Sequence, residues 1–149
     1  MKQNYFLVKI FVIYLFFITA GFAAKSKYFE EGKILFDKKE FDKSKIFFER
    51  DIVFNPKSEK SYLYLAKIFN NNNNDQQEEM NLNNVLLLNP RNDEAIYMLV
   101  ILKIKHSDYD EAKELIKKFK LVCKRLCSKK SEIQERFDKL IPENAKDND

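Results

Sequence analysis

The only two cysteines, Cys123 and Cys127, are separated by a spacing that limits the chemistry open to them. An even count suits a disulfide if the chain enters an oxidising compartment. In a regular helix, however, residues four positions apart have Cβ atoms about 6 Å apart, whereas a disulfide needs about 3.8 Å. We therefore expect a bridge only if the helix ends or tightens near Leu126 and Cys127, and two buried thiols are the alternative. The Cys-x-x-Cys spacing of redox enzymes is absent, so catalytic thiol chemistry is not expected.

The single histidine, His106, lies in the segment KIKHSDYDEA, which has the composition of a turn followed by a helix start. Ser107 or Asp108 can cap that helix, and Asp110 and Glu111 suit its first turn. A metal site needs more ligands than two cysteines and one distant histidine. The sequence contains no glycine-rich phosphate loop, no nucleophile elbow and no histidine pair at metal-ligand spacing. It therefore predicts no enzyme, no metal and no cofactor.

A basic segment over residues 113–130 contains eight Lys or Arg and one acid. Its lysines at helical spacing are Lys113, Lys117, Lys120 and Lys124. Such a face could contact anionic lipid or an acidic partner. We prefer the alternative, a solvated helix face whose cations lie near the negative end of the helix dipole.

The first 24 residues have the pattern of a secretory signal peptide. Lys2 and Lys9 precede an apolar run from Ile10 to Ile18, and small residues follow up to Ala24, so that cleavage after Ala23 or Ala24 would fit. The alternative is an uncleaved membrane anchor, since residues 6–24 are just long enough to span a bilayer. We therefore expect an exported, periplasmic protein, or one anchored in the inner membrane.

The amino-acid composition argues against an all-β fold and against a nucleic-acid partner. The chain has 149 residues, with only two Gly and three Pro, and 34% of its residues are charged. So few turn residues argue against an all-β fold, and the abundance of Lys and Glu favours amphipathic helices. Without Lys2 and Lys9, 25 Lys and Arg stand against 23 Asp and Glu, a net charge of +2. No nucleic-acid partner is predicted, because such binders are usually far more basic.

Residues of the same type recur every 34 positions. Asn55-Pro56 and Asn89-Pro90 are 34 residues apart, and each pair ends an apolar run. The aligned sets are Tyr28, Tyr62 and Ile96; Gly32, Ala66 and Val100; Phe48, Leu82 and Ile116; and Phe54, Leu88 and Val122. The exceptions are Asp75 between Phe41 and Tyr109, Glu78 between Ser44 and Ala112, and Lys124 where a third Pro would fall. Within each 34-residue unit the apolar residues have the spacing of amphipathic helices. In the first two units, Pro ends the second helix.

This pattern resembles the tetratricopeptide repeat (TPR), a pair of antiparallel helices in 34 residues, here in a small exported protein of bacterial type. The resemblance covers roughly residues 25–124 and departs from the family pattern at Glu31, Val100 and Lys103. It implies an all-α, right-handed α-solenoid of about three helix-turn-helix repeats over residues 25–141. The helices predicted are 25–37, 41–54, 58–70, 75–88, 92–105 and 108–126, followed by a capping helix within 131–142. Five asparagines, residues 70–74, fall in the turn of the second repeat, and residues 142–149 are expected to form a flexible tail.

The resemblance also implies a function, which is to bind a protein segment without catalysis in the concave groove formed by the first helix of each pair. The residues predicted to bind the partner are Phe29, Lys33, Phe36, Leu63, Lys67, Tyr97, Ile101 and Ile104. An apolar strip with lysines suits an extended or helical peptide with apolar anchors and some acidity. With three repeats the groove is short, so a partner subunit or the chain's own terminus could fill part of it. The alternative function is a membrane-anchored assembly subunit that contacts anionic lipid or an acidic partner through the basic sixth helix. The oligomeric state stays open.

Overall fold

The computed structural model describes residues 26–140, and the predicted signal peptide and C-terminal tail lie outside this range. The helices are α2 (Lys27–Asp37), α3 (Phe41–Phe54), α4 (Glu59–Asn71), α5 (Asp75–Leu88), α6 (Asp93–Lys105), α7 (Tyr109–Val122) and α8 (Lys130–Asp138), with a short 3-10 helix η2 (Cys127–Lys129) before α8. Between residues 26 and 140 the structure contains no strand. The all-α prediction is therefore confirmed.

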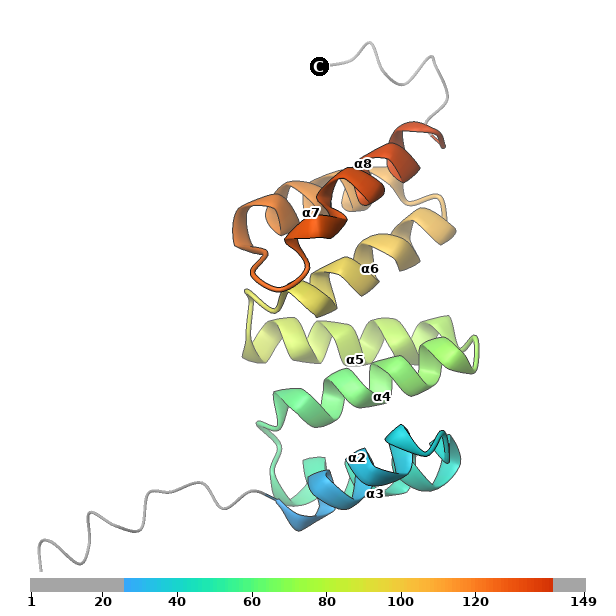
Figure 1. Cartoon of the computed structure of the whole chain (residues 1–149), viewed down its shortest axis with the longest axis vertical. Coiled ribbons are helices and arrows are strands. Elements are labelled where there is room, and N and C mark those ends of the chain that lie inside the picture. The colour runs from blue at the N-terminus through green and yellow to red at the C-terminus, as the bar shows by residue number, and fades with distance from the viewer. Residues whose placement is uncertain (1–25, 141–149) are drawn as a thin grey trace, which may run out of the picture.

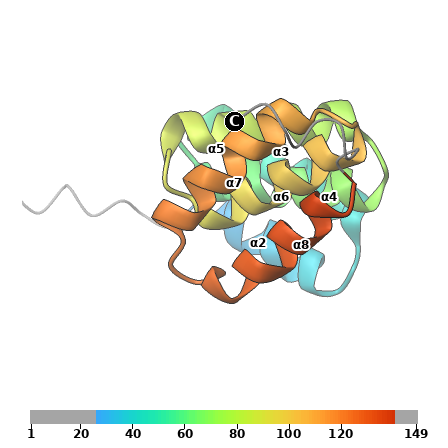
Figure 2. The ribbon, with the colours of Figure 1, turned by 90° about the horizontal axis from the view of Figure 1, so that it is seen from above.

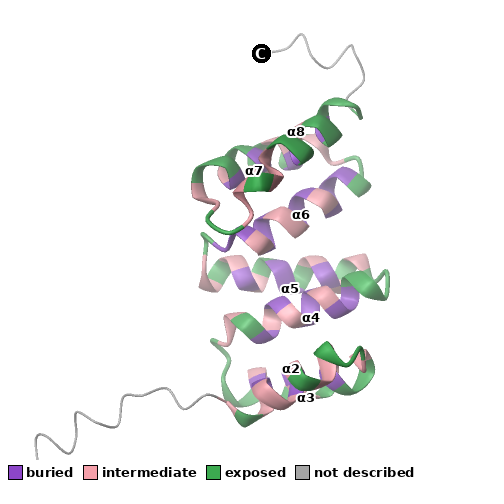
Figure 3. Cartoon of the chain, in the orientation of Figure 1, coloured by how far each residue is buried: buried purple, intermediate pink, exposed green. Residues whose placement is uncertain are grey.

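The helices form a two-layered stack. The first helices of the pairs, α2, α4 and α6, lie in one layer together with α8, and α3, α5 and α7 lie in the other (Figures 1 and 2). Buried residues line the contacts between successive helices along the whole stack (Figure 3). One apolar cluster joins repeats one and two, a second joins repeats two and three, and a third joins repeat three to α8. Each pair thus buries its apolar face against the next pair, as stacked repeats require.

Small residues let the paired helices approach closely. A Cβ atom on Gly32 would lie 2.9 Å from a ring carbon of Phe48, so a larger residue would separate α2 from α3. Ser44 Oγ donates a hydrogen bond to the Gly32 carbonyl at 2.8 Å, which ties the two helices at the same point. In the next repeat the corresponding residue is the fully buried Ala66. The close approach explains the small side chains at this position in repeats one and two, whereas repeat three has Val100 there.

The turn inside each repeat uses the same backbone conformation. Lys39, Asn73 and Ser107, which are 34 residues apart, have φ values of 62°, 53° and 59°. This left-handed conformation is unfavourable for most residues and easiest for Gly and Asn. The asparagine tract provides both the left-handed Asn73 and the helix cap Asn74, whose side chain accepts a hydrogen bond from the Gln77 N–H. The predicted turn is therefore present over residues 72–74, whereas Asn70 and Asn71 form the end of α4.

The residues that break the 34-residue pattern are held by polar contacts. Glu78 is buried and accepts two hydrogen bonds from Asn70 Nδ2, at 3.0 and 3.1 Å. Asp75 binds Lys105 Nζ at 2.6 Å and His106 Nε2 at 2.9 Å, which connects the turns of repeats two and three. Lys103 is buried, and its Nζ lies 2.7 Å from both Glu79 and Glu111.

The bounds of the six predicted helices agree with the observed bounds to within two residues, except at the end of the sixth helix, where the prediction is wrong. It was predicted to run to residue 126, and α7 ends at Val122. The reason is a loop that leaves the helix at Cys123 and is held by Asp93. Ser58, which precedes α4, makes no capping hydrogen bond to the backbone and donates instead to Ser61 Oγ at 2.9 Å.

None of the helices between residues 26 and 140 is both long enough and apolar enough to cross a membrane.

Candidate functional site

A groove of about 550 Å³ lies on the layer of first helices, between α2 and α4. Its residues from α2 are Phe29, Glu30, Lys33, Ile34 and Asp37, and those from α4 are Glu59, Lys60, Leu63, Tyr64 and Lys67. Asn92 and Glu94 at the start of α6 and Arg125 from the loop after α7 close its far end. The volume falls within the range of sites that bind small ligands or short segments. Of the eight residues predicted to bind a partner, this groove brings together Phe29, Lys33, Leu63 and Lys67.

The floor of the groove is formed by packed aromatic rings. Phe29 packs against Phe48 and Tyr64 with ring centroids 5.7 Å from each. The predicted partner-binding residue Phe36 does not line the groove, because its ring packs edge-on against Phe41 at 5.3 Å and Tyr64 at 4.9 Å. It supports Tyr64 from the side.

The charges of the groove are mostly paired with one another. Lys33 Nζ lies 2.5 Å from Asp37, and Lys67 Nζ lies 2.7 Å from Glu94. Hydrogen bonding to Asp37 raises the pKa of Lys33 above its ordinary value, so this amine stays protonated. Lys33 and Lys67 therefore offer less attraction to an acidic ligand than the sequence suggested.

Lys60 differs from the other cations of the groove. Its Nζ lies 5.9 Å from the centre of the Phe29 ring, a cation–π distance. It makes no ion pair with any residue between 26 and 140. An acidic group on a ligand would find its counter-ion here.

In the third repeat, α8 packs over the side that corresponds to the groove. Ile133 and Phe137 of α8 are buried in the same cluster as Ile104, and Tyr97 packs against that cluster. Tyr97 also lies 6.1 Å from the Phe119 ring and donates a hydrogen bond to Glu132 of α8 at 3.3 Å. The predicted partner-binding residues Tyr97 and Ile104 thus contact the chain's own capping helix, and Ile101, which is half-buried, does not line the groove.

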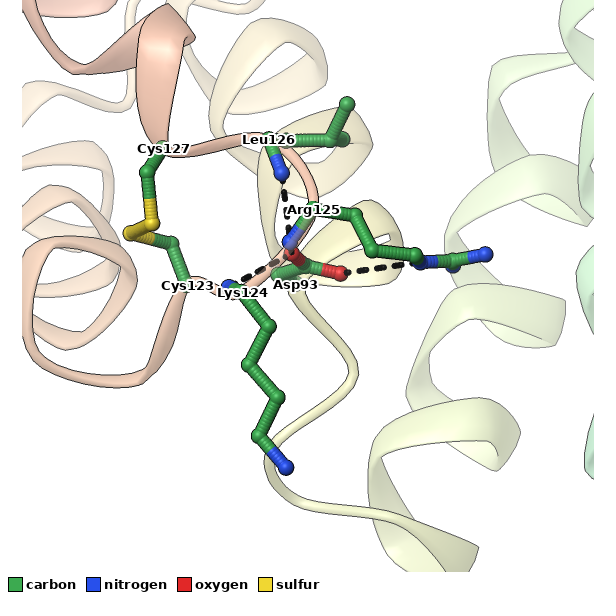
Figure 4. Close-up of a disulfide and its surroundings, with 6 residues drawn as sticks. All are labelled: Asp93, Cys123, Lys124, Arg125, Leu126 and Cys127. Atoms are coloured by element: carbon green, nitrogen blue, oxygen red, sulfur yellow. Dashed lines mark hydrogen bonds and ion pairs between the residues drawn. A yellow bond between two sulfur atoms is a disulfide. The ribbon is translucent and has the colours of Figure 1, made fainter.

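A loop before α8 is fixed by one buried carboxylate and one covalent bond. Cys123 and Cys127 form a disulfide with Cα atoms 5.2 Å apart, across the end of α7 (Figure 4). Asp93 Oδ2 accepts hydrogen bonds from the backbone N–H groups of Lys124 at 2.9 Å, Arg125 at 2.6 Å and Leu126 at 3.1 Å. The bridge is compatible with a separation of four residues because the chain has left the helix at Cys123.

The Asp93 carboxylate is stabilised in its charged form. Burial acts to raise its pKa, but the three backbone N–H groups and the nearby Arg125 guanidinium outweigh burial, so the pKa lies below its usual value. The loop in turn directs Arg125 toward the groove, where its guanidinium lies 3.3 Å from Glu94. Asp93 therefore couples the capping helix to the end wall of the groove.

The basic face predicted on the sixth helix is only partly present. Lys117 binds Glu114 at 2.8 Å, and Lys120 donates to Gln134 of α8 at 2.6 Å. Lys124 lies beyond the end of α7, since the helix stops at Val122. The four lysines do not share one helix face.

Two groove residues could have been found from the sequence by helical spacing. Lys60 and Tyr64 lie one turn from Leu63 and Lys67 on the same side of α4, which positions i, i+3, i+4 and i+7 imply. Glu94 could have been predicted only by aligning the starts of successive repeats. The position of Arg125 in the groove could not have been predicted, because the sequence predicted that Arg125 lies inside a helix.

Comparison with known proteins supports the fold. No protein-family model matches the chain, and no curated relative matches it. Among solved structures it is similar to the Arabidopsis OM64 TPR domain, with a TM-score of 0.69 and 19% identity over 76% of this chain and 93% of that one. It is also similar to a chain of the CopN-Scc3 complex, with a TM-score of 0.64 and 20% identity over 73% and 66% of the two chains. A third similarity is to the Sgt2 TPR domain from Aspergillus fumigatus, with a TM-score of 0.64 and 14% identity over 76% and 78%. The chain therefore has the fold of a TPR domain, a right-handed α-solenoid closed by a capping helix.

Proposed function

We propose that this chain is a non-catalytic protein-interaction module that binds a short segment of another protein in the groove between α2 and α4. The groove itself supports this proposal. It lies over repeats one and two, and Glu94 and Arg125 line its far end. One of the similar solved structures is a chain of a protein complex, CopN-Scc3, which agrees with this function class.

The chemistry of the groove favours a particular kind of segment. The half-buried Tyr64 and the exposed Ile34 offer apolar contact at its centre and rim. Lys60 offers one positive charge, while Lys33 and Lys67 are already neutralised by Asp37 and Glu94. We expect a segment with an apolar anchor and a single acidic group, because further acids would meet the groove's own carboxylates.

We further propose that the protein acts outside the cytoplasm, either released after signal cleavage or held by an N-terminal anchor. The support is the sequence of residues 1–24 and the pair Cys123 and Cys127, which suits an oxidising compartment. Sequencing the N-terminus of the purified protein distinguishes the two forms. A start at Ala24 or Lys25 rejects the anchor.

The groove is tested by crosslinking capture from the native source with matched variants of the full chain. The groove variant is Ile34→Glu with Lys60→Glu, and the control is Ile46→Glu with Lys38→Glu. Both variants make the same chemical changes at exposed positions, but only the first lines the groove. We expect the groove variant to capture about tenfold less of the partner than the unchanged chain does. This corresponds to a loss of ~1.4 kcal/mol of binding free energy. Equal loss in both variants, or none in either, would reject the proposed site.

Phe36 and Tyr97 are unsuitable targets for this test. Phe36 supports the aromatic floor, and Tyr97 is covered by α8. A charge at either position would disturb the fold before it could report on binding.

A further inference from the structure

The most exposed large apolar side chains of residues 26–140 lie at the ends of equivalent helices in the three repeats. Val53 and Phe54 are 72% exposed, Leu87 is 80% exposed and Leu121 is 83% exposed. All lie in the last turn of α3, α5 or α7. The other large apolar residues classed as exposed have values of only 46–54%.

Three of these side chains follow the repeat. Val53, Leu87 and Leu121 are 34 residues apart, so each repeat presents one aliphatic side chain at the equivalent position. The loops that follow, residues 55–58, 89–92 and 123–126, lie at one edge of the stack, and the turns inside the repeats lie at the opposite edge (Figure 1). We call the edge formed by these three helix ends and loops the loop edge.

Each loop of this edge also contributes a cation. Lys57, Arg91 and Lys124 are exposed, and the three loops contain no Asp or Glu. Within residues 26–140 no carboxylate forms an ion pair with any of these three side chains. The helix dipole explains cations at these helix ends. It does not explain why an exposed aliphatic side chain accompanies them in every repeat.

A hollow of about 320 Å³ between the second and third loops suits an anionic head group. Arg91, Lys124 and Arg125 line it together with Asn89. Its two acids are already engaged: Glu59 accepts hydrogen bonds from Asn89 and Asn92, and Asp93 accepts three from the backbone of the third loop. The hollow therefore leaves Arg91 and Lys124 available to a phosphate.

We propose that the loop edge binds the surface of an anionic membrane, with Val53, Leu87 and Leu121 entering the head-group region and Lys57, Arg91 and Lys124 contacting lipid phosphates. Surface binding of this kind grows with inserted apolar area and with basic residues near the membrane. A protein partner would need three separate pockets at the repeat spacing, whereas a bilayer accepts side chains that project singly. A second copy of the chain would bring like charges together.

The position of the N-terminus supports lipid as the occupant. Helix α2 begins at the loop edge (Figure 1), and the sequence before it contains the apolar run of residues 10–18. If that segment is retained as an anchor, it holds the loop edge at the membrane. If it is cleaved, the loop edge binds on its own. The proposal does not depend on the function proposed for the groove, because none of its six residues lines that groove.

The test is hydrogen exchange of the protein with its natural N-terminus, in detergent-free solution or, if anchored, reconstituted. Vesicles of equal parts phosphatidylglycerol and phosphatidylcholine are compared with vesicles of phosphatidylcholine alone. We expect at least threefold slower exchange in the loops 55–58, 89–92 and 123–126 with the anionic vesicles only. The turns at residues 38–40, 72–74 and 106–108 lie at the opposite edge and serve as the internal control.

Matched variants locate the effect on the loop edge. Val53→Ser, Leu87→Ser and Leu121→Ser combined should abolish the slowing, and Ile46→Ser, Met80→Ser and Leu140→Ser combined should preserve it. Lys57→Glu with Arg91→Glu should abolish it as well, and Lys38→Glu with Lys39→Glu should not. All these side chains are exposed, so circular dichroism should report unchanged folding.

Three outcomes would overturn the proposal. One is no slowing with anionic vesicles, and a second is equal slowing at both edges. The third is normal vesicle binding by the loop-edge variants together with loss of a crosslinked protein, which would assign the edge to a protein partner. Failure here would leave the groove test unaffected, since none of the six loop-edge residues lines the groove.

Discussion

Repeats one and three are built from the same helix pair, yet their concave sides differ. In repeat one, Phe29 and Lys33 face an open groove. In repeat three, Ile104 belongs to the apolar cluster that includes Ile133 and Phe137 of α8, and Tyr97 packs against that cluster. The comparison teaches that a TPR-like sequence predicts which helix faces point inward, whereas the element that follows decides whether those faces remain available to a partner.

The difference arises at the junctions between repeats. The first two junctions are four-residue loops, 55–58 and 89–92, each containing Asn-Pro. The third lacks the Pro, and seven residues, 123–129, separate α7 from α8. Asp93 and the disulfide hold this longer connection in place. The closed end of the solenoid therefore depends on contacts that the open end does not use.

Removing the cap should have the largest effect on this comparison. Phe137 is 4% exposed within the third apolar cluster, so Phe137→Ala should lower the free energy of unfolding by about 3 kcal/mol. Hydrogen exchange should accelerate in α8 and α6 and change little in α2 and α3. Uniform acceleration along the stack would show that the two ends do not unfold independently. Urea denaturation gives the magnitude.

Asp93→Asn should have the next largest effect, about 2 kcal/mol, because a neutral amide accepts weaker hydrogen bonds from the loop. The pKa of Asp93 is lowered in the folded protein, so its stabilisation is present above the unfolded pKa of about 3.9 and is lost as pH falls through the folded pKa. The variant should therefore show a shallower loss of stability on acidification. Urea midpoints between about pH 3 and pH 7 measure this slope.

Glu78 provides a control for the pH experiment, because its pKa is shifted in the opposite direction to that of Asp93. Burial raises its pKa above the ordinary value, although hydrogen bonds from Asn70 act against this. Its contribution to stability is therefore largest at low pH and is lost as pH rises through the folded pKa. Glu78→Gln should make the loss of stability on acidification steeper. Matching slopes for the two variants would contradict the assigned pKa directions.

Replacing both cysteines by serine should have the smallest effect of the three. The short loop that the disulfide closes corresponds to ~2 kcal/mol of chain entropy. The hydrogen bonds to Asp93 keep part of that order, so we expect a loss of about 1 kcal/mol, confined to α8 and residues 123–129. Thermal denaturation and hydrogen exchange check both the size and the location. A loss larger than that of Phe137→Ala would show that the disulfide, rather than the apolar cluster, holds the cap.

Sequence periodicity was enough to predict the repeats and the turn within the asparagine tract, and the family resemblance named four residues that line one groove, Phe29, Lys33, Leu63 and Lys67. Apolar spacing reports directly on which side of a helix is buried. It could not predict the end of α7, because the contacts that end the helix come from Asp93, about thirty residues earlier in the chain. Nor could it predict that α8 covers Tyr97, since the spacing in α6 is the same whether the face meets a ligand or a neighbouring helix.

The left-handed residues at positions 39, 73 and 107 give every repeat the same internal bend, although they are Lys, Asn and Ser. We therefore expect that 34-residue segments beginning at equivalent positions could be duplicated without disturbing the turn inside each repeat. A gene carrying a second copy of residues 55–88 between Leu88 and Asn89 would extend the solenoid by one unit and leave its cap at the new end. Such duplication offers the chain a simple route to a longer binding surface.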